Sequence, residues 1–285
     1  MKIAVAGKGG VGKTFIAGTL ARLLSRDGYR VLAVDADPAM NLAFALGVPS
    51  AVASRIVPIT ENKELIEERT GARQRSGFSM FINLTPTVDD IAERYGVMAH
   101  DGVRLLVLGT VRSGGSGCMC PANALIRALI RHITLMEGDA VVMDMEAGLE
   151  HLGRATVRGF DALLCVVDPG AQSIETAARI TRLANEIGVK EVLVVANKTT
   201  TEEDERFIEA SLSSIGLNLV CSVPFDKNII RAEALRVAPL DYASSSPAIL
   251  AIKELERILK QKTLRTVPSS SGPNRKYEER SGVRK

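Results

Sequence analysis

The sequence predicts an α/β protein with a doubly wound, mostly parallel sheet and helices on both faces. Short β-branched runs alternate with amphipathic stretches along most of the chain, as expected for crossover units. Residues Gly7–Thr14, GKGGVGKT, fit the phosphate-binding loop pattern GxxxxGK followed by Ser or Thr, and they stand between a strand-like run and a helical one. Carboxylates also follow two other predicted strands, at the sheet edge where ligands bind in such folds. These three observations predict a P-loop nucleotide-binding fold.

The predicted elements alternate from the first residues to the last helix. Each strand is a short apolar run, and each helix has apolar residues spaced by three or four positions. The predicted strands are Ile3–Ala6, Arg30–Val34, Arg104–Leu108, Ala140–Met143, Ala162–Val167, Glu191–Ala196 and Leu219–Val223. The predicted helices are Lys13–Arg26, Ala122–Ile133, Ser173–Ile187, Glu202–Ile215 and Pro247–Lys260. We treat the less regular Ser50–Val103 as an insertion within one domain, with a surface helix at Glu61–Arg69 and a loop at Gly71–Gly77.

Composition divides the chain into one folded domain, residues 1–261, and a basic tail, residues 262–285. Hydrophobic residues make up 46% of the sequence, which is enough for a sizeable core. The tail carries a charge of +5 and the rest of the chain −2. Proline, serine and glycine without apolar periodicity indicate that the tail is disordered. Because the domain has no broad basic surface, we expect no nucleic-acid partner.

The same inspection excludes membrane and secreted classes. No apolar run approaches the roughly 18 residues that span a bilayer, and the first residues are typical of a strand rather than a signal peptide. The four cysteines are not spaced like a disulfide scaffold. We therefore expect a cytoplasmic protein with no membrane partner.

The glycine-rich loop predicts how a nucleotide is held. Glycines let the backbone curl so that N–H groups converge on phosphate oxygens, and the following helix adds its positive end. Lys13 is expected to reach the β- and γ-phosphates, and Thr14 to ligate Mg²⁺. The alternative, a glycine-rich turn with a chance lysine, fits the flanking strand and helix poorly. The nucleotide-binding residues expected in the loop are Gly9, Gly10, Val11, Gly12, Lys13, Thr14 and Phe15.

Further residues are expected near the loop because they follow predicted strands. Asp144 is a candidate to hold Mg²⁺ through a water, and Asp37 to orient or deprotonate the attacking water. Gly148 offers a peptide that can turn toward the γ-phosphate. The alternative for either aspartate alone is a helix cap, which is common at strand ends, but the convergence of three features on one edge disfavours it for the set. Asn197 is placed to read a purine base, although asparagine is also an ordinary turn residue.

A cysteine pair suggests a second chemistry. Cys118 and Cys120 follow a glycine- and serine-rich run and precede an apolar helix, whose N-terminus favours the thiolate form. Two sulfurs at this spacing can grip one soft or borderline metal ion, and a twofold dimer would supply two more ligands. A redox pair or two incidental thiols remain as alternatives. Cys165 and Cys221 lie in apolar strands and are expected to be inert.

With its extra lysine, the loop resembles that of the deviant P-loop ATPases, which include nitrogenase iron protein and the septum-site and partition ATPases. Within them, GGSGCMCPANAL and VVMDMEAGLEHLGRAT are similar to the CooC-type ATPases that assist nickel insertion into carbon monoxide dehydrogenase. The resemblance implies an ATP-dependent homodimer that binds nickel, or zinc in its place, at Cys118 and Cys120. It also implies that Lys8 reaches the partner's nucleotide, and that Asp37 and Asp144 are switch aspartates.

Phe15 departs from the family, which usually has a second Thr or Ser there for the α-phosphate; only the Phe15 backbone N–H remains for this contact. Together with the P-loop, the resemblance thus implies a slow ATPase, a metallochaperone with carbon monoxide dehydrogenase as its client. Two rivals remain. A partition-type ATPase predicts a membrane helix or a basic DNA face, and an electron-transfer ATPase predicts an iron–sulfur cluster on the cysteines.

Overall fold

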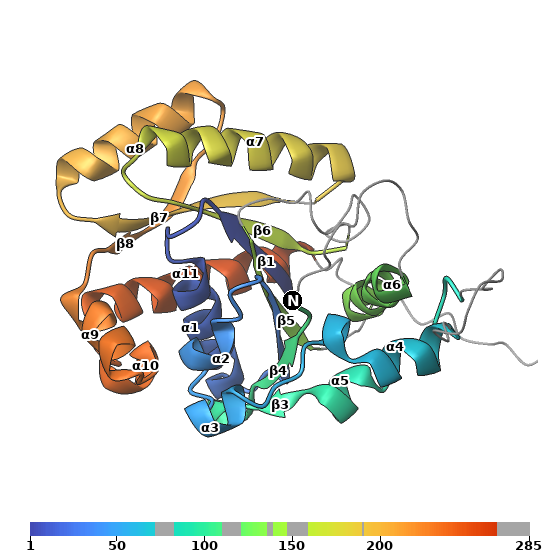
Figure 1. Cartoon of the computed structure of the whole chain (residues 1–285). Coiled ribbons are helices and arrows are strands. Elements are labelled where there is room, and N and C mark those ends of the chain that lie inside the picture. Colours follow the sequence, from blue (N-terminus) through green and yellow to red (C-terminus); the bar gives the residue numbers. More distant parts are fainter. Residues whose placement is uncertain (72–82, 110–120, 136–138, 147–158, 190, 267–285) are drawn as a thin grey trace, which may run out of the picture.

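The computed structural model describes residues 1–71, 83–109, 121–135, 139–146, 159–189 and 191–266 of the 285. Within these ranges eight strands form one sheet, in the order β3-β4-β2-β5-β1-β6-β7-β8 (Figure 1). The strands are β1 (Lys2–Gly7), β2 (Val31–Ala36), β3 (Val97–Met98), β4 (Arg104–Val107), β5 (Ala140–Met145), β6 (Ala162–Val167), β7 (Val192–Thr199) and β8 (Leu219–Pro224).

The sheet is doubly wound and mostly parallel, as the sequence predicts. The chain extends the sheet to both sides of β1, which pairs in parallel with β5 and with β6. The exception is β3, a two-residue edge strand that pairs antiparallel with β4 through Val97 and Leu105. This strand lies inside the segment that we treated as an insertion, so the sequence analysis missed it.

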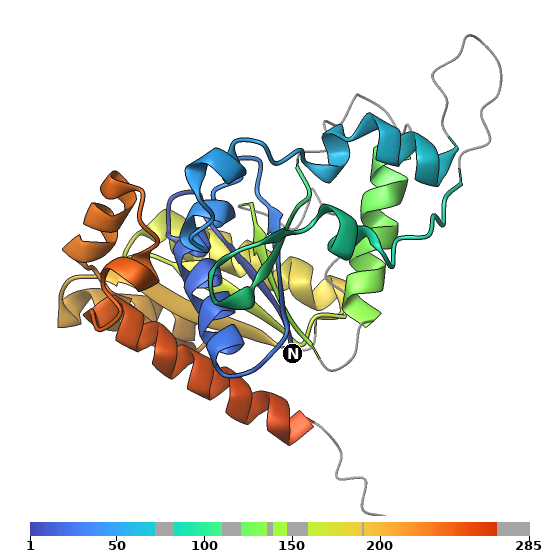
Figure 2. The same ribbon diagram turned by 90° about the horizontal axis from the view of Figure 1, so that it is seen from below.

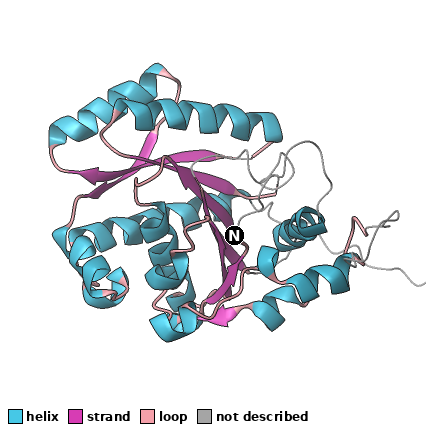
Figure 3. Ribbon diagram, viewed as in Figure 1, coloured by secondary structure: helices cyan, strands magenta, loops and turns pink. Residues whose placement is uncertain are grey.

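Helices cover both faces of the sheet, so that the strands form the central layer (Figure 3). The α-helices are α1 (Lys13–Arg26), α2 (Leu42–Ala45), α3 (Ser50–Ala53), α4 (Lys63–Thr70), α5 (Ile91–Tyr95), α6 (Pro121–Leu135), α7 (Ala171–Ile187), α8 (Glu202–Ser214), α9 (Lys227–Leu235), α10 (Pro239–Tyr242) and α11 (Pro247–Thr266). Two 3₁₀ turns are η1 (Ile59–Glu61) and η2 (His100–Gly102).

Strand residues feed two separate cores because successive side chains point to opposite faces. In β1, Ala4 and Ala6 join a core shared with α6, α7 and α8, whereas Ile3 and Val5 join a core shared with α1 and α11. The α11 residues Ile249, Ile252 and Leu255 are fully buried in this second core. Figure 2 shows α11 running beside α1, which it contacts.

The predicted boundaries agree best for the central elements. Helix α1 has the predicted ends, whereas α11 continues from Lys260 to Thr266. Strands β2, β5 and β7 continue past their last predicted residues, so that Asn197 lies within β7 rather than after it. The helices α2, α3, α5, α9 and α10 were not predicted, and of the predicted loop at Gly71–Gly77 only Gly71 is described.

A buried arginine fastens α1 to two distant segments. Arg22 is 1% exposed, and its Nε donates to Asp101 Oδ2 at 2.6 Å. Its Nη1 and Nη2 donate to the two carboxylate oxygens of Asp241 at 2.8 and 2.6 Å. The two parallel hydrogen bonds to Asp241 match the planar geometry of the guanidinium group. The ion pairs therefore tie α1 to η2 and α10.

Candidate nucleotide site

The phosphate-binding loop joins β1 to α1 in the order that the sequence predicts. Gly10 and Gly12 have φ values of 79° and 96°, in the left-handed region that favours glycine. Gly12 is the N-cap residue of α1, so the first N–H groups of the helix, which have no partner within it, open toward the loop. A concave set of donors beside a positive helix end is suited to phosphate oxygens.

Three side chains donate hydrogen bonds to carbonyl groups of this loop, one from the loop itself and two from β7. Lys13 Nζ donates to the Lys8 carbonyl at 3.2 Å, and Asn197 Nδ2 donates to the Val11 carbonyl at 2.7 Å. Lys198 Nζ donates to the Gly10 carbonyl at 2.7 Å. With its carbonyls occupied in this way, the loop can present its N–H groups to an anion.

Lys198 was missed by the sequence analysis, and its signal was weak. Lys198 follows Asn197, which we considered only as a residue that reads a purine base. Its φ of 62° is left-handed, and it lies at an irregularity in the pairing of β7 with β8. The bulge re-aims the end of the strand. Asn197 beside it lines the cavity, but its amide nitrogen contacts the phosphate loop, a contact that the sequence analysis did not predict.

The two predicted Mg²⁺ ligands lie side by side. Thr14 Oγ1 donates to Asp144 Oδ2 at 2.6 Å, although the two residues are 130 positions apart. Asp144 is fully buried, and its Oδ1 has no hydrogen-bond partner among the described residues. A hydroxyl and a carboxylate with an unpaired oxygen are the ligand types that a hard cation prefers. These residues therefore fit Mg²⁺, directly or through water.

A second buried carboxylate adjoins this corner. Asp35 is paired with Asp144 in the register of β2 and β5, and both residues have 0% exposure. Burial raises the pKa of Asp35 to about 6. Burial also raises the pKa of Asp144 to about 7, against the Thr14 hydrogen bond, which lowers it. The corner thus has negative charge that is poorly compensated by the protein, as a cation site requires.

Asp37 lies in the loop after β2, beside the same corner. Its Oδ1 accepts a hydrogen bond from the Ala39 backbone at 2.8 Å, and its own N–H donates to Asp35 Oδ1 at 3.1 Å. The residue is partly exposed and lines the cavity described next. This position suits a group that acts on water next to the phosphates.

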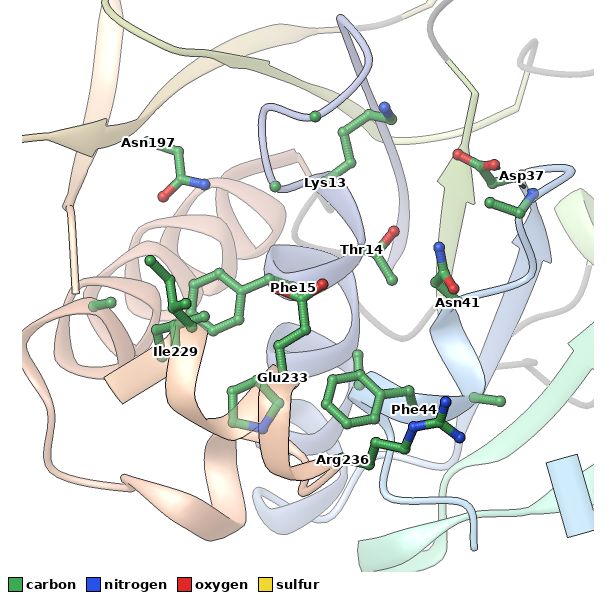
Figure 4. A pocket seen from close by; sticks show the side chains of 18 of the residues that line it. Lys13, Thr14, Phe15, Asp37, Asn41, Phe44, Asn197, Ile229, Glu233 and Arg236 are labelled. Carbon is green, nitrogen blue, oxygen red and sulfur yellow. Dashed lines mark hydrogen bonds between the residues drawn. The ribbon is translucent and has the colours of Figure 1, made fainter. Parts of the chain in front are cut away.

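A cavity of about 1120 Å³ extends from the loop along the outer side of α1 (Figure 4). Gly9, Gly10, Gly12, Lys13, Thr14, Phe15, Asp37 and Asn197 line it, so that these predicted residues are brought together from three strand ends. Lys8, Val11 and Asp144 were also predicted as site residues but do not line this cavity. In Figure 4, Lys13 and Thr14 lie between Asn197 on one side and Asp37 on the other.

The opposite wall of the cavity was not predicted. It comes from the end of β8 and from α9, and it includes Phe225, which is 41% exposed, and Ile229. The Phe15 ring points toward Ile229 in Figure 4, and both side chains pack against the same core. Phe15 therefore adds apolar surface where the resembled family has a hydroxyl. An apolar wall beside a phosphate loop suits the base and ribose of a nucleotide.

The cysteine pair and part of the predicted switch lie outside the described residues. Cys118, Cys120 and Gly148 fall in segments that the structure does not describe. Within the described ranges, no group of three or more His, Cys, Asp or Glu side chains could hold a metal ion. Cys165 is fully buried, and burial raises its thiol pKa to about 12, as expected for an inert residue. Cys221 is half-buried, and burial raises its thiol pKa to about 11.

The fold and the loop together define a P-loop ATPase. The chain belongs to the CobQ/CobB/MinD/ParA nucleotide binding domain family, whose model matches residues 2–248. The resemblance found in the sequence is thereby confirmed at the level of the family.

Individual relatives place the chain more narrowly, beside the CooC proteins. It is 47% identical over 233 residues to the carbon monoxide dehydrogenase accessory protein CooC of Rhodospirillum rubrum, covering 82% of this chain and 87% of that protein. It is 42% identical over 258 residues to an uncharacterised ATP-binding protein of Methanocaldococcus jannaschii, covering 90% and 96% of the two chains.

Solved structures agree with the fold. MinD in the MinC:MinD cell division complex of Aquifex aeolicus matches with a TM-score of 0.67 and 22% identity, covering 98% of this chain and 99% of that one. MinD of Pyrococcus horikoshii, complexed with Mg-ADP, matches with a TM-score of 0.65 and 19% identity, covering 94% and 98%. At these identities the likeness concerns the fold alone.

Proposed function

We propose that this ATPase assists nickel insertion into carbon monoxide dehydrogenase by coupling ATP hydrolysis to a change in a homodimer. The observation that carries the proposal is the 47% identity to a carbon monoxide dehydrogenase accessory protein over most of both chains. The pair Cys118 and Cys120 supports it, because thiolates suit nickel and zinc.

The residues that line the cavity favour one orientation of MgATP. The phosphates lie against the loop, where Lys13 faces the β- and γ-phosphates, and the nucleoside lies against the apolar wall of Phe225 and Ile229. Asn197 lines the same cavity, and its role in reading a purine base remains part of the proposal. Mg²⁺ held by Thr14 and Asp144 would neutralise charge on the phosphates.

Hydrolysis requires a water in line with the γ-phosphate and positive charge on its oxygens. Asp37 orients that water and accepts its hydrogen bond. Lys13 of one protomer stabilises the charge that develops in the transition state. Lys8 does the same for the nucleotide of the second protomer, so that turnover depends on the dimer. Because Lys8 of one protomer acts on the nucleotide of the other, turnover of an isolated protomer is slow.

Nickel is the cargo of this cycle. In a twofold dimer the cysteine pairs of both protomers form one four-sulfur site, and the nucleotide state determines whether the dimer holds or releases the ion. The ion then passes to the client enzyme. Zinc is the competing ion, since it accepts the same thiolate ligands.

The partition-type alternative has less support from the fold. It requires a helix that lies on a membrane or a basic face, whereas Ile249, Ile252, Leu255 and Leu259 of α11 are buried in the core. No helix within the described residues is long and apolar enough to cross a membrane. The iron–sulfur alternative is tested by visible absorbance. A protein that binds such a cluster and is purified without oxygen would be brown and show cluster absorbance.

Equilibrium dialysis against Ni²⁺, with oligomer mass measured on the same samples, tests the proposal. We expect the wild type to bind about one ion per dimer, the stoichiometry of a shared four-thiolate site. The Cys118→Ser/Cys120→Ser variant should lose that ion. Cys165→Ser is the matched control, because it removes a buried thiol and should leave nickel binding unchanged. Equal nickel binding by the double variant would refute the cysteine site.

A further inference from the structure

Asp35 has a buried carboxylate that the proposed mechanism does not use. It lies at the end of β2 with 0% exposure. One oxygen, Oδ1, accepts the N–H of Asp37 at 3.1 Å, and the other, Oδ2, accepts the N–H of Leu42 at 3.0 Å. The carboxylate therefore bonds to both ends of the segment between them, residues 37–42, which we call the switch loop.

The switch loop has few other constraints. Met40 is 42% exposed and has a left-handed φ of 50°, which costs a non-glycine residue about 1 kcal/mol or more. Within the loop, the N–H of Met40 donates to the Asp37 carbonyl at 3.0 Å. Pro38, Ala39 and Asn41 are exposed as well. Because these residues make no apolar core of their own, the loop depends on its two ends for its shape.

Asp35 also replaces a missing helix cap. Leu42 is the first residue of α2, and the side chain of the N-cap residue Asn41 makes no capping hydrogen bond. Asp35 supplies the acceptor for this N–H from seven positions earlier in the chain. A hydrogen bond from a backbone N–H to a carboxylate is stronger than one between neutral groups. The end of the loop is thereby fixed at α2.

The base of this clamp is rigid. The Asp35 carbonyl accepts the N–H of Leu108 at 2.8 Å, and the residue is the register partner of Asp144 in the neighbouring strand. Asp144 in turn bonds to Thr14 at the start of α1. The clamp thus fixes the switch loop to β2, which pairs with the strand that carries Asp144 of the Mg²⁺ corner.

We propose that Asp35 is a positioning residue, which clamps the switch loop so that Asp37 is held at the water next to the γ-phosphate. Asp35 is fully buried and does not line the cavity, so it acts through Asp37, whose N–H it accepts. The inference rests on the hydrolysis proposed for this site. Removing the clamp lowers the rate of the chemical step and leaves the phosphate loop, which binds the nucleotide, in place.

Single-turnover hydrolysis and MgATP affinity of Asp35→Ala and Asp35→Asn, at saturating Mg²⁺, test this role. In Asp35→Ala we expect hydrolysis to slow by about 10- to 100-fold, the cost of a misplaced catalytic group. The Kd for MgATP should change by less than about threefold, which is under 1 kcal/mol. Asp35→Asn keeps the shape and one acceptor oxygen, so its rate should fall between those of Asp35→Ala and the wild type.

Hydrogen exchange supplies a readout that a general loss of stability does not reproduce. The amides of Asp37 and Leu42 should lose protection in Asp35→Ala, while the amides of β1 and β5 keep theirs. The matched control is Asp161→Ala, since Asp161 Oδ2 accepts the Lys2 N–H at 2.9 Å at the opposite edge of the sheet. The control should hydrolyse ATP at the wild-type rate.

The outcomes separate this inference from the proposed function. A wild-type rate in both Asp35 variants, a parallel loss of MgATP affinity, or an equal loss in Asp161→Ala would each overturn the clamp. If Asp35→Ala does not fold, Asp35→Asn decides by the same criteria. If the wild-type protein hydrolyses no ATP, the proposed function fails, and unchanged exchange of Asp37 and Leu42 would then overturn the clamp independently.

Discussion

Gly12 is the residue at which the phosphate loop leaves the least room. A Cβ there would lie 2.2 Å from Asn197 Nδ2, which is impossible without movement, and the φ of 96° already disfavours other residues. Gly28 has a similar φ of 91°, but a Cβ at that residue would have no heavy atom within 4 Å. Comparing substitutions at Gly12 and Gly28 therefore separates the effect of backbone strain from the effect of a steric clash with Asn197.

We predict that Gly12→Ala weakens MgATP binding by at least about tenfold, because the loop and Asn197 must separate. Gly28→Ala should cost only the backbone strain, about 1–2 kcal/mol of unfolding free energy, with unchanged MgATP affinity. Isothermal titration and urea denaturation of the two variants check this. Wild-type affinity in Gly12→Ala would show that the contact with Asn197 has no role in shaping the loop.

At the scale of elements, the ion pairs of Arg22 join α1 to η2 and α10. Removing one partner of a buried ion pair lowers the free energy of unfolding by about 3–5 kcal/mol. The loss is smaller here, because Asp101 and Asp241 are 21% and 30% exposed and water can solvate their charges. We predict that Arg22→Met lowers the free energy of unfolding by about 2–3 kcal/mol. Arg26→Met, at a side chain that is 41% exposed, should cost under about 1 kcal/mol. Equal losses would refute the anchoring role of Arg22.

The same ion pairs predict a pH dependence. Burial raises the pKa of Asp241, but hydrogen bonding and charge from Arg22 outweigh it and hold that pKa below the usual carboxyl range. The pKa of Asp101 is lowered as well: burial raises it, but the hydrogen bonds from Arg26 and Arg22 outweigh that effect. A folded-state pKa below the unfolded one contributes stability above the unfolded pKa, near 4, that is lost as the pH falls through the lower folded value.

We therefore predict that the stability difference between the wild type and Arg22→Met shrinks as the pH falls below about 4. Urea denaturation at neutral and acidic pH measures it, with Arg26→Met alongside. A difference that stays constant down to low pH would mean that the carboxylates contribute nothing through their charge.

The sequence predicted the helices and strands in which buried apolar residues recur at a regular spacing. Helix α1 has an apolar stripe and was predicted to its ends, whereas in α9 only Ala232 is buried, so no stripe marks it. Strands β2 and β5 were predicted to stop before Asp35 and Asp144, since apolarity ends there. The sheet continues because the backbone pairing does not depend on side-chain type.

At the scale of the whole molecule, parallel pairing of β1, β2 and β5 gathers the site at one edge of the sheet. This made Lys13, Thr14 and Asp144 predictable as one group, although Thr14 and Asp144 are 130 residues apart. The apolar wall at Phe225 was not predictable, because exposed apolar residues have no periodic signal. The role inferred for Asp35 was hidden as well, because it depends on a hydrogen bond to a backbone group, and any residue type at position 42 except proline offers that group.

Steady-state ATP hydrolysis by the wild type and by Lys13→Ala tests the central claim most directly, that this loop is the catalytic phosphate cradle. Lys63→Ala, at an exposed lysine of α4, serves as the control. The account predicts that Lys13→Ala hydrolyses ATP at least about 100-fold more slowly, as expected when a transition-state charge loses its partner, while Lys63→Ala matches the wild type. Unchanged hydrolysis by folded Lys13→Ala would contradict the account.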